Sequence, residues 1–221
     1  MNYLYLTVLC LAVMAAFIYF EKKEKYVLAV VLKGCASACF VVLGVYSSVG
    51  GTNFCQKVVI GLILGMIADI LLNLRWVFEK QGKIIFLVGI LVFLSGHVMY
   101  ILALLPECEH LLLAIIVGII LTAGILAWIF SRITAQMAFK IFGVFYIGAI
   151  TIMNCIALTN LIGNPCGTNI MFVIGALSFL ISDIVLILNT FGSESKFSLR
   201  IVNLSLYYLG QILIALSMQL L

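Results

Sequence analysis

Four ionisable side chains stand inside long apolar stretches of this sequence: Lys33, Asp69, His97 and Asp183. An ionisable group at the centre of a bilayer costs about 2.5–3.5 kcal/mol even on a lenient insertion scale. Two buried aspartates are therefore a strong functional signal in a chain with eight acidic residues. Two neighbouring carboxyl groups in a low dielectric cannot both ionise, so one stays protonated while the other acts as a base. Asp69 and Asp183 are thus predicted to perform general acid–base chemistry, the alternative being a packing contact between helices.

Other polar side chains share helical faces with these four groups. Gly61, Gly65, Asp69 and Asn73 recur every fourth residue, and small residues on such a stripe let another helix approach the carboxylate. Lys33 either pairs with an aspartate or snorkels to the membrane interface. The alternative for His97 is a purely structural hydrogen bond, and the alternative for the serines and asparagines is helix packing. The residues that we expect to bind substrate or to support the aspartates are Lys33, His97, Tyr100, Asn73, Tyr146, Ser182, Tyr207, Tyr208 and Gln211.

Other hydrolytic chemistries lack their motifs. The sequence has no G-x-S-x-G nucleophile elbow, no H-E-x-x-H zinc motif and no cysteine–histidine signature. A metal held by Asp69, His97 and Asp183 fits their depths along the helices poorly. Neither a metal nor a cofactor is expected.

The composition shows in which kind of protein these residues are placed. Hydrophobic residues make up 66% of the 221 residues and charged residues 9%, with a mean hydropathy of +1.33. Soluble domains carry about 25% charged residues. The composition therefore excludes a water-soluble globule, a disordered chain and a nucleic-acid binder, despite the net charge of +4.

Eight apolar runs are each long enough to cross a bilayer, which takes about 20 residues. We therefore predict an all-α membrane protein, a bundle of eight transmembrane helices that forms a single domain over residues 1–221. The first and fifth runs hold almost no polar residue at mid-span and should lie at the periphery. The predicted spans are 3–20, 26–46, 57–74, 83–105, 110–130, 138–159, 170–191 and 200–220.

Basic residues predict the orientation, because cytoplasmic loops carry an excess of lysine and arginine. Ten of the twelve basic residues flank the odd-numbered loops. The odd loops should be cytoplasmic and both termini should lie on the opposite side, in a bacterial inner membrane. Helix lengths then place both aspartates and Lys33 about 18–20 Å from the non-cytoplasmic ends, with His97 about 6–8 Å higher.

Two pairs of segments suggest an internal duplication. LILGMIADILLNL (62–74) and ALSFLISDIVLIL (176–188) align on their aspartates, and SGHVMYILAL (95–104) aligns with LGQILIALSM (209–218) at the same offset of 114 residues. An even number of spans would relate two four-helix repeats in parallel, with a pseudo-twofold axis along the membrane normal. Such an axis would bring Asp69 and Asp183 together.

Seven cysteines show no metal-ligand spacing. Cys55, Cys108 and Cys166 all lie near even loops, on the predicted non-cytoplasmic side. Two alternatives stay open for them, a disulfide between two of the three or three free thiols.

The strings GMIADILLNL, FLSGHVMYI, GALSFLISDIVLILNTF and YYLGQILIAL occur in this order. Together with Lys33 they resemble the successive motifs of the lysoplasmalogenase (YhhN-like) membrane proteins, from about residue 26 to the end. Ala68 stands where that family commonly has glycine, and Gly34 where proline is frequent. These departures leave the candidate catalytic groups in place and the substrate open.

The resemblance implies a hydrolase that cleaves the vinyl-ether bond of lysoplasmalogens to a fatty aldehyde and glycerophospho-ethanolamine or -choline. Asp69 and Asp183 would share the acid–base work, Lys33 would keep one of them ionised, and the lysophospholipid would come laterally from the bilayer. Arg75 and Lys83 stand near enough to meet its phosphate. The headgroup preference, the identity of the acid and the oligomeric state are not predicted.

Two other functions fit part of the pattern. Paired aspartates, a lysine and repeated halves are also typical of a proton-coupled transporter that uses the intramembrane Asp, Lys and His groups. No span is broken by glycine or proline at mid-depth, which counts against transport. A lipid-binding or scaffold protein is the third alternative.

Overall fold

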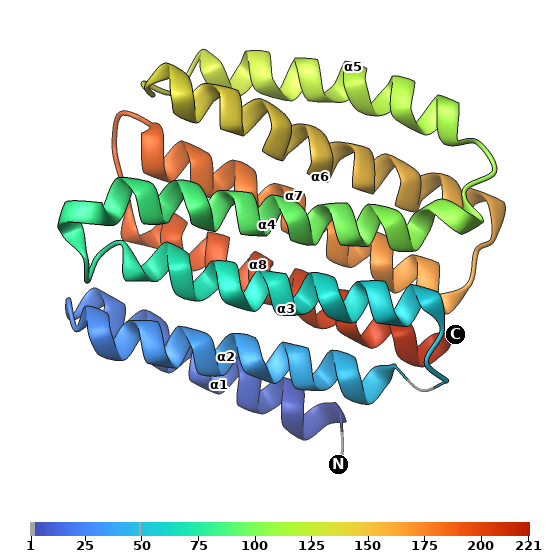
Figure 1. The fold of residues 1–221 in the computed structure, drawn as a ribbon, viewed down its shortest axis with the longest axis horizontal. Coiled ribbons are helices and arrows are strands. Elements are labelled where there is room, and N and C mark those ends of the chain that lie inside the picture. Colours follow the sequence, from blue (N-terminus) through green and yellow to red (C-terminus); the bar gives the residue numbers. More distant parts are fainter. Residues whose placement is uncertain (1–2, 49) are drawn as a thin grey trace.

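The computed structural model describes residues 3–48 and 50–221, and this part of the chain folds into eight long helices (Figure 1). Each of them is long and apolar enough to cross a membrane. Short 3-10 turns follow α3, α4 and α8, and the described residues form no β-strand. The helices are α1 (Tyr3–Lys22), α2 (Tyr26–Ser47), α3 (Asn53–Leu74), α4 (Gly82–Leu104), α5 (Leu111–Phe130), α6 (Met137–Gly163), α7 (Gly167–Phe191) and α8 (Phe197–Ser217).

The eight predicted spans are confirmed, but several helices extend beyond their apolar runs. α3, α7 and α8 begin three or four residues early, and α6 ends four residues late. Polar contacts at the helix ends account for part of this extension. The Thr52 side chain caps α3 by accepting from the Cys55 N–H at 3.2 Å, and Asn189 accepts from the Lys196 N–H at 2.7 Å just before α8. Hydropathy detects only the apolar part of a helix, whereas capped polar turns continue it.

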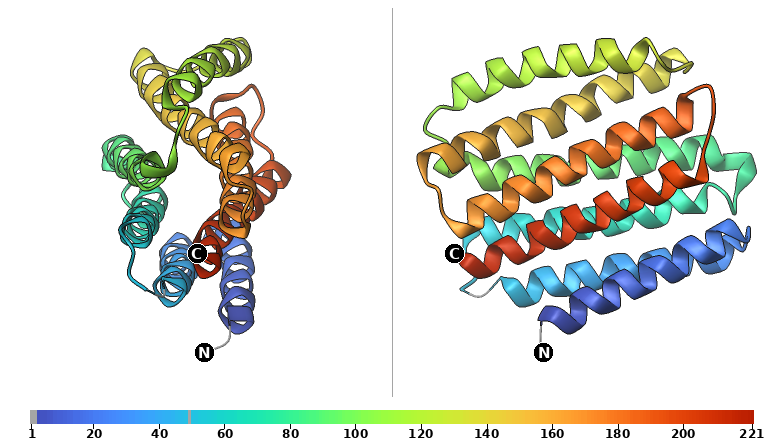
Figure 2. Two further views of the ribbon diagram at one scale, coloured as in Figure 1. Left: turned by 90° about the vertical axis from the view of Figure 1, so that its right-hand side faces the viewer. Right: turned by 180° about the vertical axis from the view of Figure 1, so that it is seen from behind.

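Burial separates central helices from peripheral ones. Only 17% of the α1 span and 22% of the α5 span is buried inside the protein, against 61% for α8. Figure 2 shows α5 and α1 at opposite outer edges of the bundle, with α8 between α7 and α2. The expectation that the first and fifth helices are peripheral is confirmed.

The two halves of the chain repeat the same packing. α3 and α7 begin 114 residues apart, at Asn53 and Gly167. α4 packs on α6, and α8 packs in the same way on α2. The close crossings also match, because a Cβ added at Gly96 would lie 3.2 Å from the Gly61 oxygen and one at Gly210 would lie 2.8 Å from the Gly175 oxygen. These contacts support the two parallel four-helix repeats that the sequence suggests.

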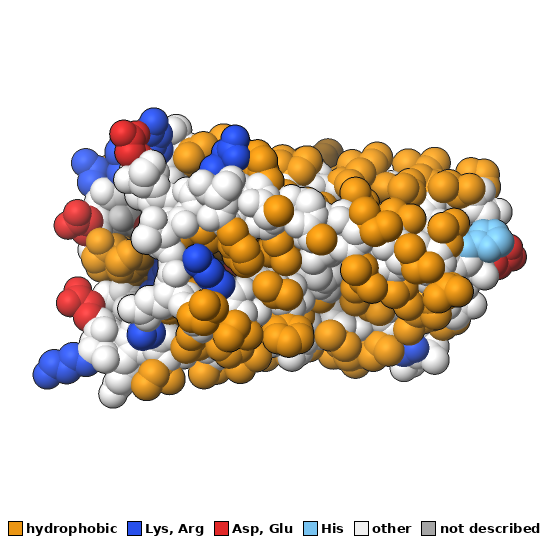
Figure 3. Space-filling model, turned by 90° about the horizontal axis from the view of Figure 1, so that it is seen from above, with side chains coloured by type: hydrophobic (Ala, Val, Ile, Leu, Met, Phe, Trp, Pro, Cys, Tyr) orange, Lys and Arg blue, Asp and Glu red, His pale blue; other side chains and the backbone are white. Residues whose placement is uncertain are grey.

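Charge is concentrated at one end of the bundle. In Figure 3 most lysine and arginine side chains gather at the left end, while hydrophobic side chains cover the long side of the molecule. This is the end where the α1–α2, α3–α4, α5–α6 and α7–α8 connections lie (Figure 1). The described chain begins in α1 and ends after α8 at the opposite end (Figure 1).

All seven cysteines are free in the structure. Cys108 lies beside the Thr159 hydroxyl at 3.3 Å rather than beside another thiol. Of the two alternatives for Cys55, Cys108 and Cys166, the structure therefore has the free thiols.

Candidate active site

A small inner pocket brings the two intramembrane aspartates to one place. Asp69 from α3 and Asp183 from α7 each stand 16 residues after the first residue of their helix, about 24 Å along it. Both carboxyl groups are only 2% exposed. The polar residues that line this pocket are Lys33, Asp69, Asn73, Arg75, Tyr146, Asp183, Arg200, Asn203 and Tyr207.

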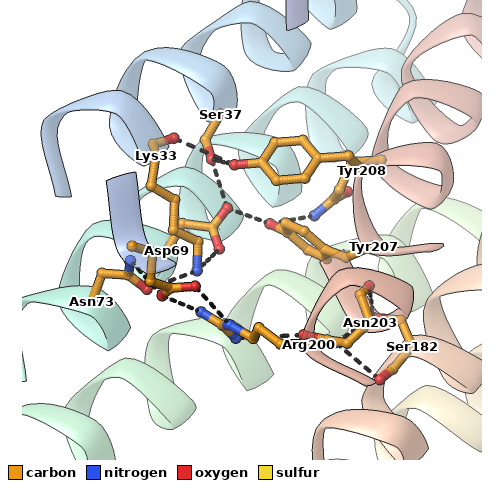
Figure 4. A network of polar contacts seen from close by, with 11 residues as sticks. Lys33, Ser37, Asp69, Asn73, Ser182, Arg200, Asn203, Tyr207 and Tyr208 are labelled. Atoms are coloured by element: carbon orange, nitrogen blue, oxygen red, sulfur yellow. Dashed lines mark hydrogen bonds and ion pairs between the residues drawn. The ribbon is translucent and has the colours of Figure 1, made fainter. Parts of the chain in front are cut away.

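Asp69 is surrounded by hydrogen-bond donors and a cation. The Lys33 Nζ lies 3.0 Å from its Oδ1, while the Ser37 and Tyr207 hydroxyls donate to its Oδ2 at 2.6 and 2.7 Å (Figure 4). Lys33 is 4% exposed, so it pairs with the aspartate instead of snorkelling. A buried carboxyl with an ammonium and two hydroxyl donors is stabilised as the carboxylate.

A second layer of contacts orients these partners. Lys33 also donates to the Asn73 Oδ1 at 3.2 Å. The Tyr208 hydroxyl lies 3.2 Å from Ser37 Oγ and donates to the Lys33 carbonyl at 3.4 Å. Hydrogen bonds therefore hold both the side-chain ammonium and the backbone carbonyl of Lys33 in place.

Asp183 has a much poorer set of partners. Tyr146 donates to its Oδ2 at 2.8 Å, and no other side chain of the described residues bonds or pairs with it. Phe93 packs on both Tyr146 and Tyr207, with ring centroids 6.2 and 5.7 Å apart. The pocket thus holds one carboxyl group with a counter-ion and one without.

Tyr100 and Gln211 act behind the pocket. Gln211 donates to the Tyr207 hydroxyl at 3.3 Å, and Tyr100 in turn donates to the Gln211 Oε1 at 2.9 Å. Neither residue lines the inner pocket. Their place in the structure is to orient Tyr207, which itself contacts Asp69.

Ser182 also lies outside the pocket lining. Its hydroxyl donates to the Asn203 carbonyl at 2.9 Å, and Asn203 Nδ2 returns bonds to the Ser182 carbonyl and hydroxyl at 3.0 and 2.8 Å (Figure 4). This reciprocal pair fastens α7 to α8 next to Asp183. The structure places Ser182 in a helix–helix contact.

His97 stands apart from the aspartates. Its ring lies among Phe93, Tyr100, Tyr146 and Phe179, with centroids 4.7–6.2 Å away. Both ring nitrogens are buried without a hydrogen-bond partner among the described residues. His97 does not line the inner pocket, so the structure does not bring it into reach of a substrate there. The described residues also contain no cluster of three His, Cys, Asp or Glu that could hold a metal ion.

A model of the YhhN family matches residues 28–218, which span α2 to α8. The chain belongs to the YhhN family. Comparisons with curated proteins and with solved structures found no match. The matched segment contains every residue of the inner pocket.

In this YhhN family protein the inner pocket opens toward the charged end through a much larger cavity of about 1000 Å³. Arg75 and Arg200 line both spaces. Arg200 forms a two-pronged ion pair with Glu21 at 2.8 and 3.0 Å, which joins α8 to the end of α1. Lys83 lines the outer cavity, where it donates to Gln136 at 2.7 Å.

An apolar groove flanks the inner pocket on another side. Helices α3 to α7 and the loop after α5 form it, and Phe93, Tyr146 and Leu186 belong to both spaces. Gly143 of α6 also lines the groove, and a Cβ added there would meet nothing within 4 Å. The groove therefore adjoins the inner pocket that holds the carboxyl groups.

The site residues expected from the sequence do not include Ser37, Glu21 or Arg200. Ser37 stands one helical turn after Lys33, so the i, i+4 rule places both on one face. Glu21 and Arg200 stand near helix ends, among charges typical of a membrane interface. No local pattern in the sequence indicates that they meet, because 179 residues separate them.

Proposed function

We propose that this YhhN family protein hydrolyses the vinyl-ether bond of lysoplasmalogens inside the membrane, with Asp183 as the acid and Asp69 as the carboxylate base. The observation that carries the proposal is the inequality of the two carboxyl groups that line one pocket. Asp69 has Lys33 and two hydroxyl donors, while Asp183 has only Tyr146. Family membership and the motif resemblance to lysoplasmalogenases support the reaction class.

The inequality determines where a shared proton resides. Two nearby carboxyl groups in a low dielectric hold one proton between them. The Lys33 ammonium stabilises negative charge on Asp69, so the proton is on Asp183. This division gives the pocket one group that can donate a proton and one that can stabilise positive charge.

The chemistry of a vinyl ether needs both groups. Asp183 donates its proton to the β-carbon, the π electrons of the C=C bond form the new C–H bond, and positive charge develops on the α-carbon and the ether oxygen as an oxocarbenium ion. The Asp69 carboxylate stabilises this cation. Water adds to the cationic carbon and gives a proton to the Asp69 carboxylate. In the collapse of the hemiacetal, Asp69 returns this proton to the leaving glycerol oxygen and the hydroxyl proton passes to Asp183, which releases a fatty aldehyde and a glycerophospho alcohol. One water is consumed, and Asp183 is protonated again at the end.

The surrounding spaces fit the two ends of such a lipid. The apolar groove accepts the hydrocarbon chain, and the outer cavity at the charged end accepts the glycerophospho headgroup. Both spaces share lining residues with the inner pocket, namely Phe86 and Leu186. A lysolipid in this position would have its ether bond next to the two carboxyl groups.

The test measures aldehyde release from a defined lysoplasmalogen by the detergent-purified protein. Asp69→Asn and Asp183→Asn should each lower turnover by about 10²–10⁴-fold, the usual contribution of a general acid or base. Glu109→Gln, the same carboxylate-to-amide change at an exposed site of the opposite end, is the matched control and should keep full turnover.

Retained turnover in both aspartate variants would overturn the pair mechanism. No aldehyde from folded wild-type protein, together with proton-driven solute uptake after reconstitution in liposomes, would favour the transporter alternative.

A further inference from the structure

Arg75 is a cation without an anionic partner at the junction of the inner pocket and the outer cavity. Its Nε is buried and has no hydrogen-bond partner, and its side chain forms no ion pair with any described residue. The other cations that line the inner pocket are neutralised, Lys33 by Asp69 and Arg200 by Glu21. With the shared proton on Asp183, the inner pocket therefore carries one uncompensated positive charge.

Five further charged side chains line the outer cavity, together with the Tyr26 hydroxyl. They are Lys22, Glu24, Glu79, Lys83 and Lys196. None of them lines the inner pocket, and the acidic ones form no ion pair with Arg75. An anion in the outer cavity therefore meets Arg75 where this cavity adjoins the inner pocket.

Two aromatic rings hold the Arg75 guanidinium in place. Its Cζ lies 4.8 Å from the Trp76 ring centroid and 4.5 Å from that of Phe86. Such stacking fixes the guanidinium plane while its N–H groups stay available. Burial and the nearby charge of Arg200 lower the pKa of Arg75 to about 10, so it is still a cation at neutral pH.

We propose that Arg75 binds the phosphate of the substrate lipid and thereby determines that a lysolipid is bound in preference to a neutral alkenylglycerol. This inference rests on the proposed function and names the residue that recognises the headgroup. A guanidinium matches phosphate oxygens with two parallel N–H donors. Arg75 stands six residues after Asp69, about 9 Å along the helix axis. The glycerol backbone that links the ether oxygen to the phosphate bridges a distance of this order.

The experiment measures binding with lipids that cannot be hydrolysed, so its result is independent of catalysis. The first probe is a saturated 1-O-alkyl lysophospholipid, and the second is the 1-O-alkylglycerol of the same chain length, which lacks the phosphate. Wild-type protein in detergent should bind the first probe about tenfold or more tightly than the second, as expected for a hydrogen-bonded charge pair. If the wild-type protein binds both probes with equal affinity, this measurement alone overturns the proposal.

Arg75→Gln should weaken binding of the phosphate-bearing probe by about tenfold or more and leave the neutral probe unaffected. Arg75→Lys keeps the charge but not the planar donor pair, so it should recover only part of the affinity. Arg132→Gln is the matched control, because Arg132 also stacks on a tryptophan, with 4.5 Å from its Cζ to the Trp128 ring centroid. Arg132 lines none of the three spaces.

Three outcomes would contradict the phosphate site: unchanged binding by Arg75→Gln, equal loss of both probes, or inorganic phosphate alone displacing the lipid probe at comparable concentration. The last would assign Arg75 to a soluble anion. If phosphate-dependent binding holds but no aldehyde is released from lysoplasmalogen, the hydrolase proposal fails and the phosphate site stands. If Arg75→Gln hydrolyses lysoplasmalogen at the wild-type KM, the phosphate site fails and the hydrolase stands.

Discussion

At the scale of single residues, the pocket shows how equivalent positions acquire different chemistry. Asp69 and Asp183 are related by the 114-residue offset, but their partners are not. The position equivalent to Lys33 is Ile147, and the position equivalent to Tyr146 is Leu32. Two carboxyl groups at the same depth therefore differ because one half of the chain supplies an ammonium and the other supplies a phenol.

Lys33→Met removes the counter-ion of Asp69 and should abolish turnover, because Asp69 then takes up a proton instead of remaining a carboxylate. Breaking a buried ion pair by removing one partner also costs about 3–5 kcal/mol of stability. The double variant Lys33→Met with Asp69→Asn leaves no uncompensated charge. It should recover most of the lost stability and none of the turnover.

Thermal unfolding in detergent and aldehyde release, measured on the same preparations, test this prediction. A double variant that is no more stable than Lys33→Met alone would show that the ion pair is not the reason for the loss. Ser178→Ala on α7 is a suitable control, since the Ser178 hydroxyl bonds only to the Ile174 carbonyl of its own helix at 2.8 Å.

At the scale of helices, the sequence predicts where the eight helices lie along the chain better than it predicts where each begins and ends. Continuous apolar runs identify all eight spans, and the stripe of Gly61, Gly65 and Asp69 identifies the face of α3 that meets other helices. Helix ends are less predictable because caps such as Thr52 lie outside the apolar run. The sequence leaves open whether Lys33 pairs with an aspartate or snorkels to the interface. Only the packing of α2 against α3 shows that it pairs with Asp69.

His97 and Ser182 show that the role of a polar residue inside a helix is also hard to predict from the sequence. A polar residue inside a span indicates contact with protein, and it does not distinguish a pocket from a helix–helix interface. Ser182 faces Asn203 and His97 faces aromatic rings because of how α7 meets α8 and α4 meets α6. These are contacts between distant segments that spacing along one helix cannot predict.

The apolar groove that α3 to α7 line gives a prediction at this scale. Gly143→Leu adds a side chain to the groove wall without displacing a neighbour, because nothing lies within 4 Å of the added Cβ. Turnover of long-chain lysoplasmalogens should fall, while short-chain substrates should be much less affected. Gly124→Leu is the matched control. Gly124 of α5 is exposed, and a Cβ added there would also meet nothing within 4 Å. It lines neither the groove, nor the inner pocket, nor the outer cavity.

kcat/KM for a series of chain lengths measures this effect. An equal loss for every chain length would mean that Gly143→Leu disturbs the carboxyl groups rather than the groove. An unchanged profile would place the hydrocarbon chain elsewhere.

At the scale of the whole molecule, the two ends of the bundle differ in charge, in their distance from the two carboxyl groups and in access to the pocket. Most basic residues lie at one end of the bundle (Figure 3). The outer cavity through which the pocket opens is lined by residues of the same end. The carboxyl groups lie about 24 Å along α3 and α7 from the other end, close to where a lipid of the charged-end leaflet has its glycerol. The leaflet that supplies the substrate is therefore decided by the orientation of the bundle.

The positive-inside rule predicts that the charged end is cytoplasmic. Alkaline phosphatase fused after Leu221 in a bacterial host should then be active, whereas green fluorescent protein at the same position should be dark. Fusions after Gly192, in the α7–α8 connection at the charged end, are the matched control and should show the reverse pattern. If Leu221 fusions fluoresce and Gly192 fusions carry active phosphatase, the pocket opens to the outer leaflet instead. The lysolipid would then have to come from the external face, because the aspartates are too far from the other interface to meet a glycerol there.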